Sequence, residues 1–103
     1  MGSQSVKIYN ELDNETLNYG AKNVATAGTA EALASSTLCY EVLIQAKRTN
    51  TSRIYVGGAS VPNNDTGGVF LIAGQSMVLT PKNLDRVYIN SVVNGEGVTF
   101  IYW

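Results

Sequence analysis

"TLCYEVLIQAK", residues 37–47, alternates between apolar and polar side chains in the way that decides the fold. Successive side chains of a β-strand point to opposite faces of a sheet, so one apolar row predicts a strand that packs on one face. Leu43 interrupts the otherwise polar row, and we expect it to point outward toward a second packing partner. We expect Cys39 to be a small, partly buried residue of the same strand. The apolar row consists of Tyr40, Val42, Ile44 and Ala46.

The residues that follow predict a turn and a second strand. Residues 48–52, RTNTS, have the composition of a polar turn, and residues 53–58, RIYVGG, begin with a β-branched and aromatic run. Together with residues 37–47 they predict a β-hairpin. Gly57 and Gly58 end the run, and glycine permits the positive φ that many tight turns require. We therefore expect these two glycines to turn the chain and not to cradle a ligand.

The rest of the chain continues as short strands separated by turn residues. Residues 61–68, VPNNDTGG, have a loop composition, and residues 94–97, NGEG, predict a further turn. The last run, VTFIYW at 98–103, is apolar or aromatic on both faces. This pattern predicts a central strand or an interface, and it makes Ile101 and Trp103 interface candidates. The other expected strands span residues 69–73, 76–80 and 85–93.

The first third of the chain has a weaker pattern. Residues 30–34, AEALA, are good helix formers, but the run is short and is flanked by Gly, Ser and Thr. We therefore expect a strand over residues 24–33 instead of a helix. We expect residues 1–25 to form an N-terminal arm or first strand, and residues 26–103 to form one β-sandwich domain. The predicted fold is all-β: a small antiparallel β-sandwich or jelly-roll-like barrel with an N-terminal arm.

The composition excludes several classes of protein. A chain of 103 residues is long enough for one hydrophobic core and too short for two. Seven basic and eight acidic side chains give a net charge of −1 without a block of like charge, so we expect neither nucleic acid nor a membrane as a partner. No run approaches the roughly 18 apolar residues of a membrane span, and the N-terminus lacks the apolar core of a signal peptide. Cys39 is the single cysteine, so no intrachain disulfide forms.

The side-chain chemistry argues against an enzyme. Histidine, the usual acid–base group at neutral pH and a common zinc ligand, is absent. The carboxylates fall in expected turns and on polar strand faces, so we expect them to be solvated, and we predict no catalytic residue, no cofactor and no metal. Two alternatives stay open: a structural calcium ion at loop 63–68 or 12–15, and carbohydrate binding by exposed aromatic side chains. The carboxylates are Glu11, Asp13, Glu15, Glu31, Glu41, Asp65, Asp85 and Glu96, and the aromatic candidates are Tyr9, Tyr19, Tyr55 and Trp103.

Four segments between residues 27 and 103 together resemble a small β-domain that recurs in virion proteins of tailed bacteriophages, among them head-decoration and head-fibre proteins. The segments are AGTAEAL (27–33), VLIQAKRTNTSRIYVGGASV (42–61), LIAGQSMVLTPKNLDRVYI (71–89) and VNGEGVTFIYW (93–103). TNTSRIYVGG and NGEGVTF carry most of the likeness. The resemblance implies that residues 54–56 form a core strand and that Gly57 and Gly58 form its exit turn. It also implies that Gly95 and Gly97 belong to the last hairpin.

The resemblance further implies a structural role in the virion and no enzymatic activity. We expect a capsid decoration (cement) protein that is made in the bacterial host cytoplasm, binds the major capsid protein on the head surface and stabilises the assembled shell. We expect a homo-oligomer, with a trimer favoured, and an N-terminal arm that contacts neighbouring subunits. The alternative is a receptor- or glycan-binding module of a phage fibre or tail protein. The candidate interface residues are Tyr9, Tyr19, Leu43, Ile101 and Trp103.

Overall fold

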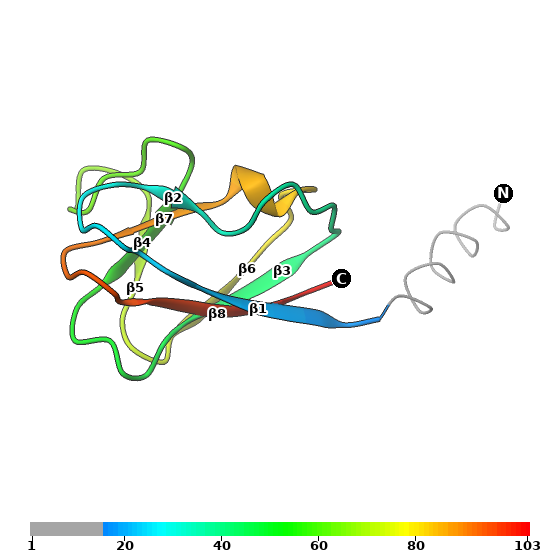
Figure 1. Cartoon of the computed structure of the whole chain (residues 1–103), viewed down its shortest axis with the longest axis horizontal. Coiled ribbons are helices and arrows are strands. Elements are labelled where there is room, and N and C mark those ends of the chain that lie inside the picture. Colours follow the sequence, from blue (N-terminus) through cyan, green and yellow to red (C-terminus); the bar gives the residue numbers. More distant parts are fainter. Residues whose placement is uncertain (1–15) are drawn as a thin grey trace, which may run out of the picture.

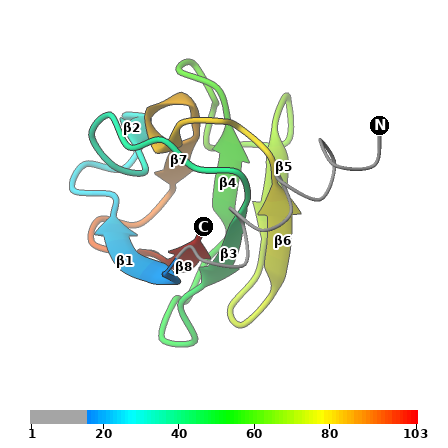
Figure 2. The same cartoon turned by 90° about the vertical axis from the view of Figure 1, so that its right-hand side faces the viewer.

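The computed structural model describes residues 16–103, whose strands surround a central core (Figures 1 and 2). Within these residues there is no α-helix, and the single helical element is the short 3-10 helix η1 (Leu84–Arg86). The all-β prediction is therefore confirmed. The strands are β1 (Asn18–Asn23), β2 (Glu31–Ala32), β3 (Val42–Ala46), β4 (Ile54–Gly57), β5 (Val69–Leu71), β6 (Ser76–Leu79), β7 (Tyr88–Ser91) and β8 (Gly97–Tyr102).

The eight strands form two four-stranded antiparallel sheets, in the orders β1-β8-β3-β6 and β2-β7-β4-β5. The pairs β1·β8, β2·β7, β3·β6 and β4·β5 are nested, as in a long antiparallel ribbon that is rolled so that alternate pairs fall into opposite sheets. This is the strand order of a jelly roll, a double-sheet architecture of eight strands. The structure thus combines the two architectures expected from the sequence: it is a β-sandwich whose strands are connected as in a jelly roll.

The core lies between the two sheets. Val42, Ile44 and Ala46 are fully buried, as the alternation in residues 37–47 predicts. Tyr40, from the same predicted row, is half exposed, because β3 begins only at Val42 and the preceding residues run along the end of the sheet. Cys39 is partly buried against the core, as expected, but it lies outside any strand.

The predicted hairpin between residues 37–47 and 53–58 is wrong. β3 and β4 belong to different sheets, so residues 47–53 carry the chain across the sandwich. The expected hairpin at residues 94–97 is also wrong, because β7 and β8 lie in different sheets too. The left-handed glycines include Gly68 (φ 74°), where a Cβ atom would lie 2.8 Å from the Val56 carbonyl oxygen, but not Gly57 or Gly58. The chain nevertheless turns where we expected it, because the Gly58 carbonyl accepts a 3.0 Å hydrogen bond from the Val61 amide directly after β4.

Residues 16–33 contain a first strand, one of the two alternatives expected for residues 1–25, but not the long strand expected over residues 24–33. β1 lies within the predicted arm and is an edge strand that pairs with β8 along its whole length. The expected strand over residues 24–33 is wrong, since this segment bends through Gly28 (φ 92°) and only Glu31 and Ala32 pair with β7. Residues 30–34 form no helix, as expected. Residues 1–15, with Tyr9 and the rest of the expected arm, lie outside the described residues.

Candidate functional site

The outer face of the β2-β7-β4-β5 sheet is covered by the chain itself over β4 and β7, while Phe70 of the edge strand β5 is 41% exposed. Ile54 and Val56 belong to the core, and Tyr55 between them points to the outer side, yet only 5% of it is exposed. Loop 58–68 folds over it: the Tyr55 hydroxyl donates to Asp65 at 3.0 Å, and the Asn90 amide donates to the Val61 carbonyl at 2.9 Å. The prediction that residues 54–56 are buried is confirmed. Tyr55, a candidate for carbohydrate stacking, is consequently not available on the surface.

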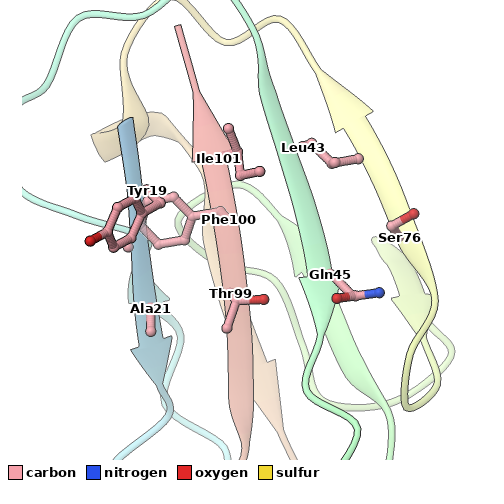
Figure 3. Close-up of a pocket in the computed structure, with 9 residues that line it drawn as sticks. Tyr19, Ala21, Leu43, Gln45, Ser76, Thr99, Phe100 and Ile101 are labelled. Carbon is pink, nitrogen blue, oxygen red and sulfur yellow. The ribbon is translucent and has the colours of Figure 1, made fainter. Parts of the chain in front are cut away.

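The outer face of the β1-β8-β3-β6 sheet carries a row of apolar side chains (Figure 3). The strand register places one residue of each strand side by side across the sheet. Tyr19 is 85% exposed, Val78 53% and Ile101 39%, while Leu43 is half-buried between its neighbours. We call this set the apolar row: Tyr19, Ile101, Leu43 and Val78. Three of the five interface candidates from the sequence therefore lie together.

The next row along the strands is made of shorter or polar side chains, and we call it the short row: Ala21, Thr99, Gln45 and Ser76. A shallow hollow of about 440 Å³ lies over the two rows, walled by Tyr19, Leu43 and Ile101 (Figure 3). The Gln45 amide is held by a 3.0 Å hydrogen bond to the Gly74 carbonyl. Neither row contains a charged side chain.

Charged groups stand at the two ends of this face. Glu41 precedes β3 and Lys47 follows it, and both share the outward direction of Leu43 and Gln45 because they are an even number of residues away. The Lys47 ammonium donates to the Asn23 side chain at 2.8 Å. The outer face thus has an uncharged centre, an acidic group at one end and a basic group at the other.

Four apolar side chains belong to the segments just before β1, just before β3 and just after β8, which meet at the Glu41 end of the sandwich. We call them the end patch: Leu17, Leu38, Tyr40 and Trp103. Leu38 is 82% exposed, and Leu17 is also exposed. The Tyr40 amide donates to the Trp103 carbonyl, which joins the two segments. Tyr40 and Trp103 line a hollow of about 410 Å³ that Glu41 and Lys82 flank. Trp103, an interface candidate from the sequence, therefore lies beside the apolar row and not within it.

The sequence prediction missed four of these residues. Val78 was detectable, because Met77 and Leu79 on either side of it are apolar as well, the same two-sided pattern that identified residues 98–103. Leu38 and Tyr40 were assigned to a strand, and the sequence carries no signal that the strand begins later. Leu17 lies in the segment that we expected only to be an N-terminal arm or first strand.

The segments TNTSRIYVGG (49–58) and NGEGVTF (94–100) lie against each other. The Glu96 carboxylate accepts hydrogen bonds from the Thr51 amide, the Thr51 hydroxyl and the Ser52 amide. Burial alone would raise the pKa of Glu96, but the bonds from Thr51 and Ser52 outweigh it and lower the pKa. Glu96 is only 9% exposed, so the expectation that it is a solvated turn carboxylate is wrong. Its role is to fix the crossing between the sheets.

Other carboxylates are also engaged in local structure. Asp65 accepts from Arg53 at 3.1 Å, and Glu31 pairs with Lys22 at 3.0 Å; the pKa of Glu31 is lowered mainly by its bond from Lys22. Among residues 16–103, no three acidic or cysteine side chains gather in a way that would hold a metal ion. In loop 63–68, one of the two segments considered for calcium, Asp65 faces Arg53 and the Asn64 side chain bonds to Thr66. The other segment, 12–15, lies outside the described residues.

Comparison with protein-family models, with curated proteins and with solved structures finds no match to this chain. Within the part of the chain that the structure describes, no helix has the length and apolarity needed to cross a membrane.

Proposed function

We propose that this protein is a structural component of a tailed-bacteriophage virion, a decoration (cement) protein that binds the major capsid protein on the assembled head and stabilises the shell as a homo-oligomer. In this proposal the protein is made in the bacterial host cytoplasm and resides on the capsid surface. The observation that carries the proposal is the apolar row beside the end patch, on a side of the sandwich that no described segment covers.

Exposed apolar side chains are common singly, but a contiguous set is typical of a surface that contacts another protein. Such a set spans four strands here and continues to Trp103, whereas the opposite sheet is covered over β4 and β7 by loop 58–68 and exposes Phe70 only on its edge strand β5. The jelly-roll order is compatible with this role, since capsid proteins use it, but lectins and enzymes use it as well. The fold therefore supports the proposal only together with the surface and the family likeness.

A decoration protein stabilises a shell through many small contacts. If each contact contributes a few kcal/mol, hundreds of symmetric copies still raise the barrier to rupture, because opening one joint breaks several contacts together. This mechanism needs a surface for the capsid and a surface for self-association. We assign the capsid contact to the end patch, whose most exposed members are Leu38 and Leu17.

The test is co-sedimentation with heads that lack the protein, combined with the temperature at which those heads release DNA. We expect wild-type protein to co-sediment in high copy number and to raise the release temperature, and Leu38→Asp to bind much more weakly. Val92→Asp is the matched control, because Val92 is also exposed but lies in the turn between β7 and β8. Wild-type protein that never sediments with heads would overturn the proposal.

The alternative is a receptor- or glycan-binding module of a fibre or tail protein, and the hollow between Tyr40 and Trp103 favours it, because aromatic rings flanked by polar groups suit sugar recognition. This alternative predicts binding to host cells or their glycans with no change in head stability. It also predicts about a dozen copies or fewer per virion, where decoration predicts hundreds. A stained gel of purified virions, scaled against the major capsid protein, separates the two.

A further inference from the structure

We infer that two copies of this chain pair face to face through the outer face of the β1-β8-β3-β6 sheet, with the apolar row of each copy seated on the short row of the other. The inference deepens the proposed function and rests on it, because it names the geometry by which the homo-oligomer forms. It departs from the trimer that the sequence favoured.

The first argument is the shape of the face. Along β3, the residues that point outward follow the order Glu41, Leu43, Gln45 and Lys47. We place a two-fold axis in the plane of the interface, perpendicular to the strands and midway between Leu43 and Gln45. This axis brings each apolar-row residue of one copy opposite the short-row residue on the same strand of the other copy. The facing pairs are then Tyr19 with Ala21, Ile101 with Thr99, Leu43 with Gln45, and Val78 with Ser76.

This match is self-complementary in volume, which is the requirement for a two-fold interface in which the same patch serves both partners. In three of the four pairs a larger side chain opposes a smaller one, so the ridge of one copy fills the hollow over the short row of the other. In the fourth pair Leu43 lies against Gln45, a side chain of similar size that the Gly74 carbonyl holds in place. Sheets that stack through interlocking side chains lie about 10 Å apart. Figure 3 shows Tyr19 and Ile101 on one level of the sheet and Ala21 and Thr99 on the next.

The second argument is charge. The same axis brings Glu41 of one copy opposite Lys47 of the other, and it does so twice because of the symmetry. Between these ends the face is uncharged, so no charge is buried without a partner. A parallel stacking without strand reversal would instead place Glu41 against Glu41, which is repulsive.

The size of the face sets the expected affinity. Four strands about 4.8 Å apart and six residues of about 3.3 Å each give a patch of roughly 400 Å² per copy in projection. This is below a standard interface, so we expect a weak, reversible association. On a capsid, where copies are held close together, such an affinity is sufficient because the effective concentration is high.

The test uses the full chain and measures its mass by analytical ultracentrifugation over the micromolar to millimolar range. We expect a monomer–dimer equilibrium that ends at twice the mass of the 11.0-kDa chain. Ile101→Arg should weaken dimerisation by about tenfold or more, because a cation would be buried opposite Thr99. Val69→Arg is the control: Val69 is as exposed as Val78 but lies on β5, in the other sheet.

Charge reversal tests the orientation of the two copies. Glu41→Lys alone and Lys47→Glu alone should each weaken dimerisation several-fold at low salt, and the double variant should restore it, since the facing pairs are opposite in charge again. Asp85→Lys, an exposed charge on η1, should leave it unchanged. Far-ultraviolet circular dichroism and a melting curve establish that each variant is folded.

A monomer at every concentration, a trimer, or a double charge reversal that fails to restore dimerisation would each overturn the inference. None of these results bears on capsid binding, which is measured separately with heads and with Leu38→Asp. Protein that binds heads but stays monomeric in solution and is insensitive to Ile101→Arg would leave the capsid-binding part of the proposed function standing and remove the face-to-face pair.

Discussion

Asn50 and Gly97 exchange two hydrogen bonds: the Asn50 amide donates to the Gly97 carbonyl at 2.8 Å, and the Gly97 amide donates to the Asn50 side-chain oxygen at 3.1 Å. Asn50 lies in the crossing from β3 to β4, and Gly97 opens β8. The side chain of Asn50 thus satisfies both backbone groups of Gly97, in a place where both residues are buried. Together with Glu96, this pair holds the β3–β4 crossing against the start of β8.

Asn50→Ala should lower the free energy of unfolding by about 2 kcal/mol, because it leaves the buried Gly97 N–H without a partner and removes one of the two hydrogen bonds that the Gly97 carbonyl accepts, the other coming from the Lys47 amide. For a domain of this size, the melting temperature should fall by about 10 °C. Asn64→Ala is the control, since Asn64 is exposed and bonds only within its own loop, and we expect a change below about 0.5 kcal/mol. Equal effects of the two substitutions would show that the crossing is not fixed by Asn50.

Gly97→Ala should prevent stable folding. A Cβ atom at this position would fall on the Lys22 carbonyl oxygen of β1 and would lie 2.5 Å from the Asn23 side-chain oxygen. Relief requires β1 to move away from β8, with a cost above about 4 kcal/mol. Gly58→Ala is the matched control, because nothing lies within 4 Å of its Cβ position, and we expect it to be neutral or slightly stabilising. Soluble expression and thermal melting distinguish the two outcomes.

The strands themselves were largely predictable from the sequence, because alternation reports directly which residues face a core. Ile44 and Ala46 are buried where the pattern places them, and Leu43 points outward as expected. The pairing of the strands was not predictable. A turn such as residues 48–52 has the same composition whether the next strand pairs with the previous one or crosses to the opposite sheet.

The candidate site was predictable only in part, for a related reason. Leu43 and Ile101 stand out as apolar residues in outward positions, but their adjacency depends on β3 pairing with β8, which lies more than fifty residues further along the chain. Glu96 was misjudged because a carboxylate in a glycine-rich turn is normally solvated, and only the tertiary contact with Thr51 buries it.

Acid should destabilise the protein partly through Glu96. Its pKa is below the ordinary value of 4.5 in the folded state, so the unfolded chain takes up the proton first as the pH falls. The contribution is complete above the ordinary pKa and is lost as the pH falls through the folded value. We expect the free energy of unfolding to decrease below about pH 5. Glu96→Gln should flatten this decrease and lower stability at pH 7 by about 2 kcal/mol.

Urea unfolding at a series of pH values measures this dependence. Glu31 also has a lowered pKa, so a smaller dependence of the unfolding free energy on pH should remain in Glu96→Gln. Adding Glu31→Gln should remove this remaining dependence. An unchanged pH profile in Glu96→Gln would mean that the carboxylate is not engaged with Thr51 and Ser52 in solution.

Leu43→Ala and Ile44→Ala are matched substitutions at neighbouring positions of β3. Comparing them distinguishes the effect of the core from the effect of the apolar row. Ile44 is fully buried, so its truncation leaves a cavity and should cost about 3 kcal/mol. Leu43 lies on the outer face, so at dilute, monomeric concentrations its truncation should cost less than about 1 kcal/mol. At concentrations where wild-type protein dimerises, the difference in melting temperature between wild type and Leu43→Ala should be larger than in dilute solution. The reason is that Leu43→Ala also loses the stabilisation that dimerisation provides. Melting curves at two concentrations measure both effects. If Leu43→Ala were as destabilising as Ile44→Ala in dilute solution, the outer face would be covered within the monomer, and the assignment of this surface to a partner would fail.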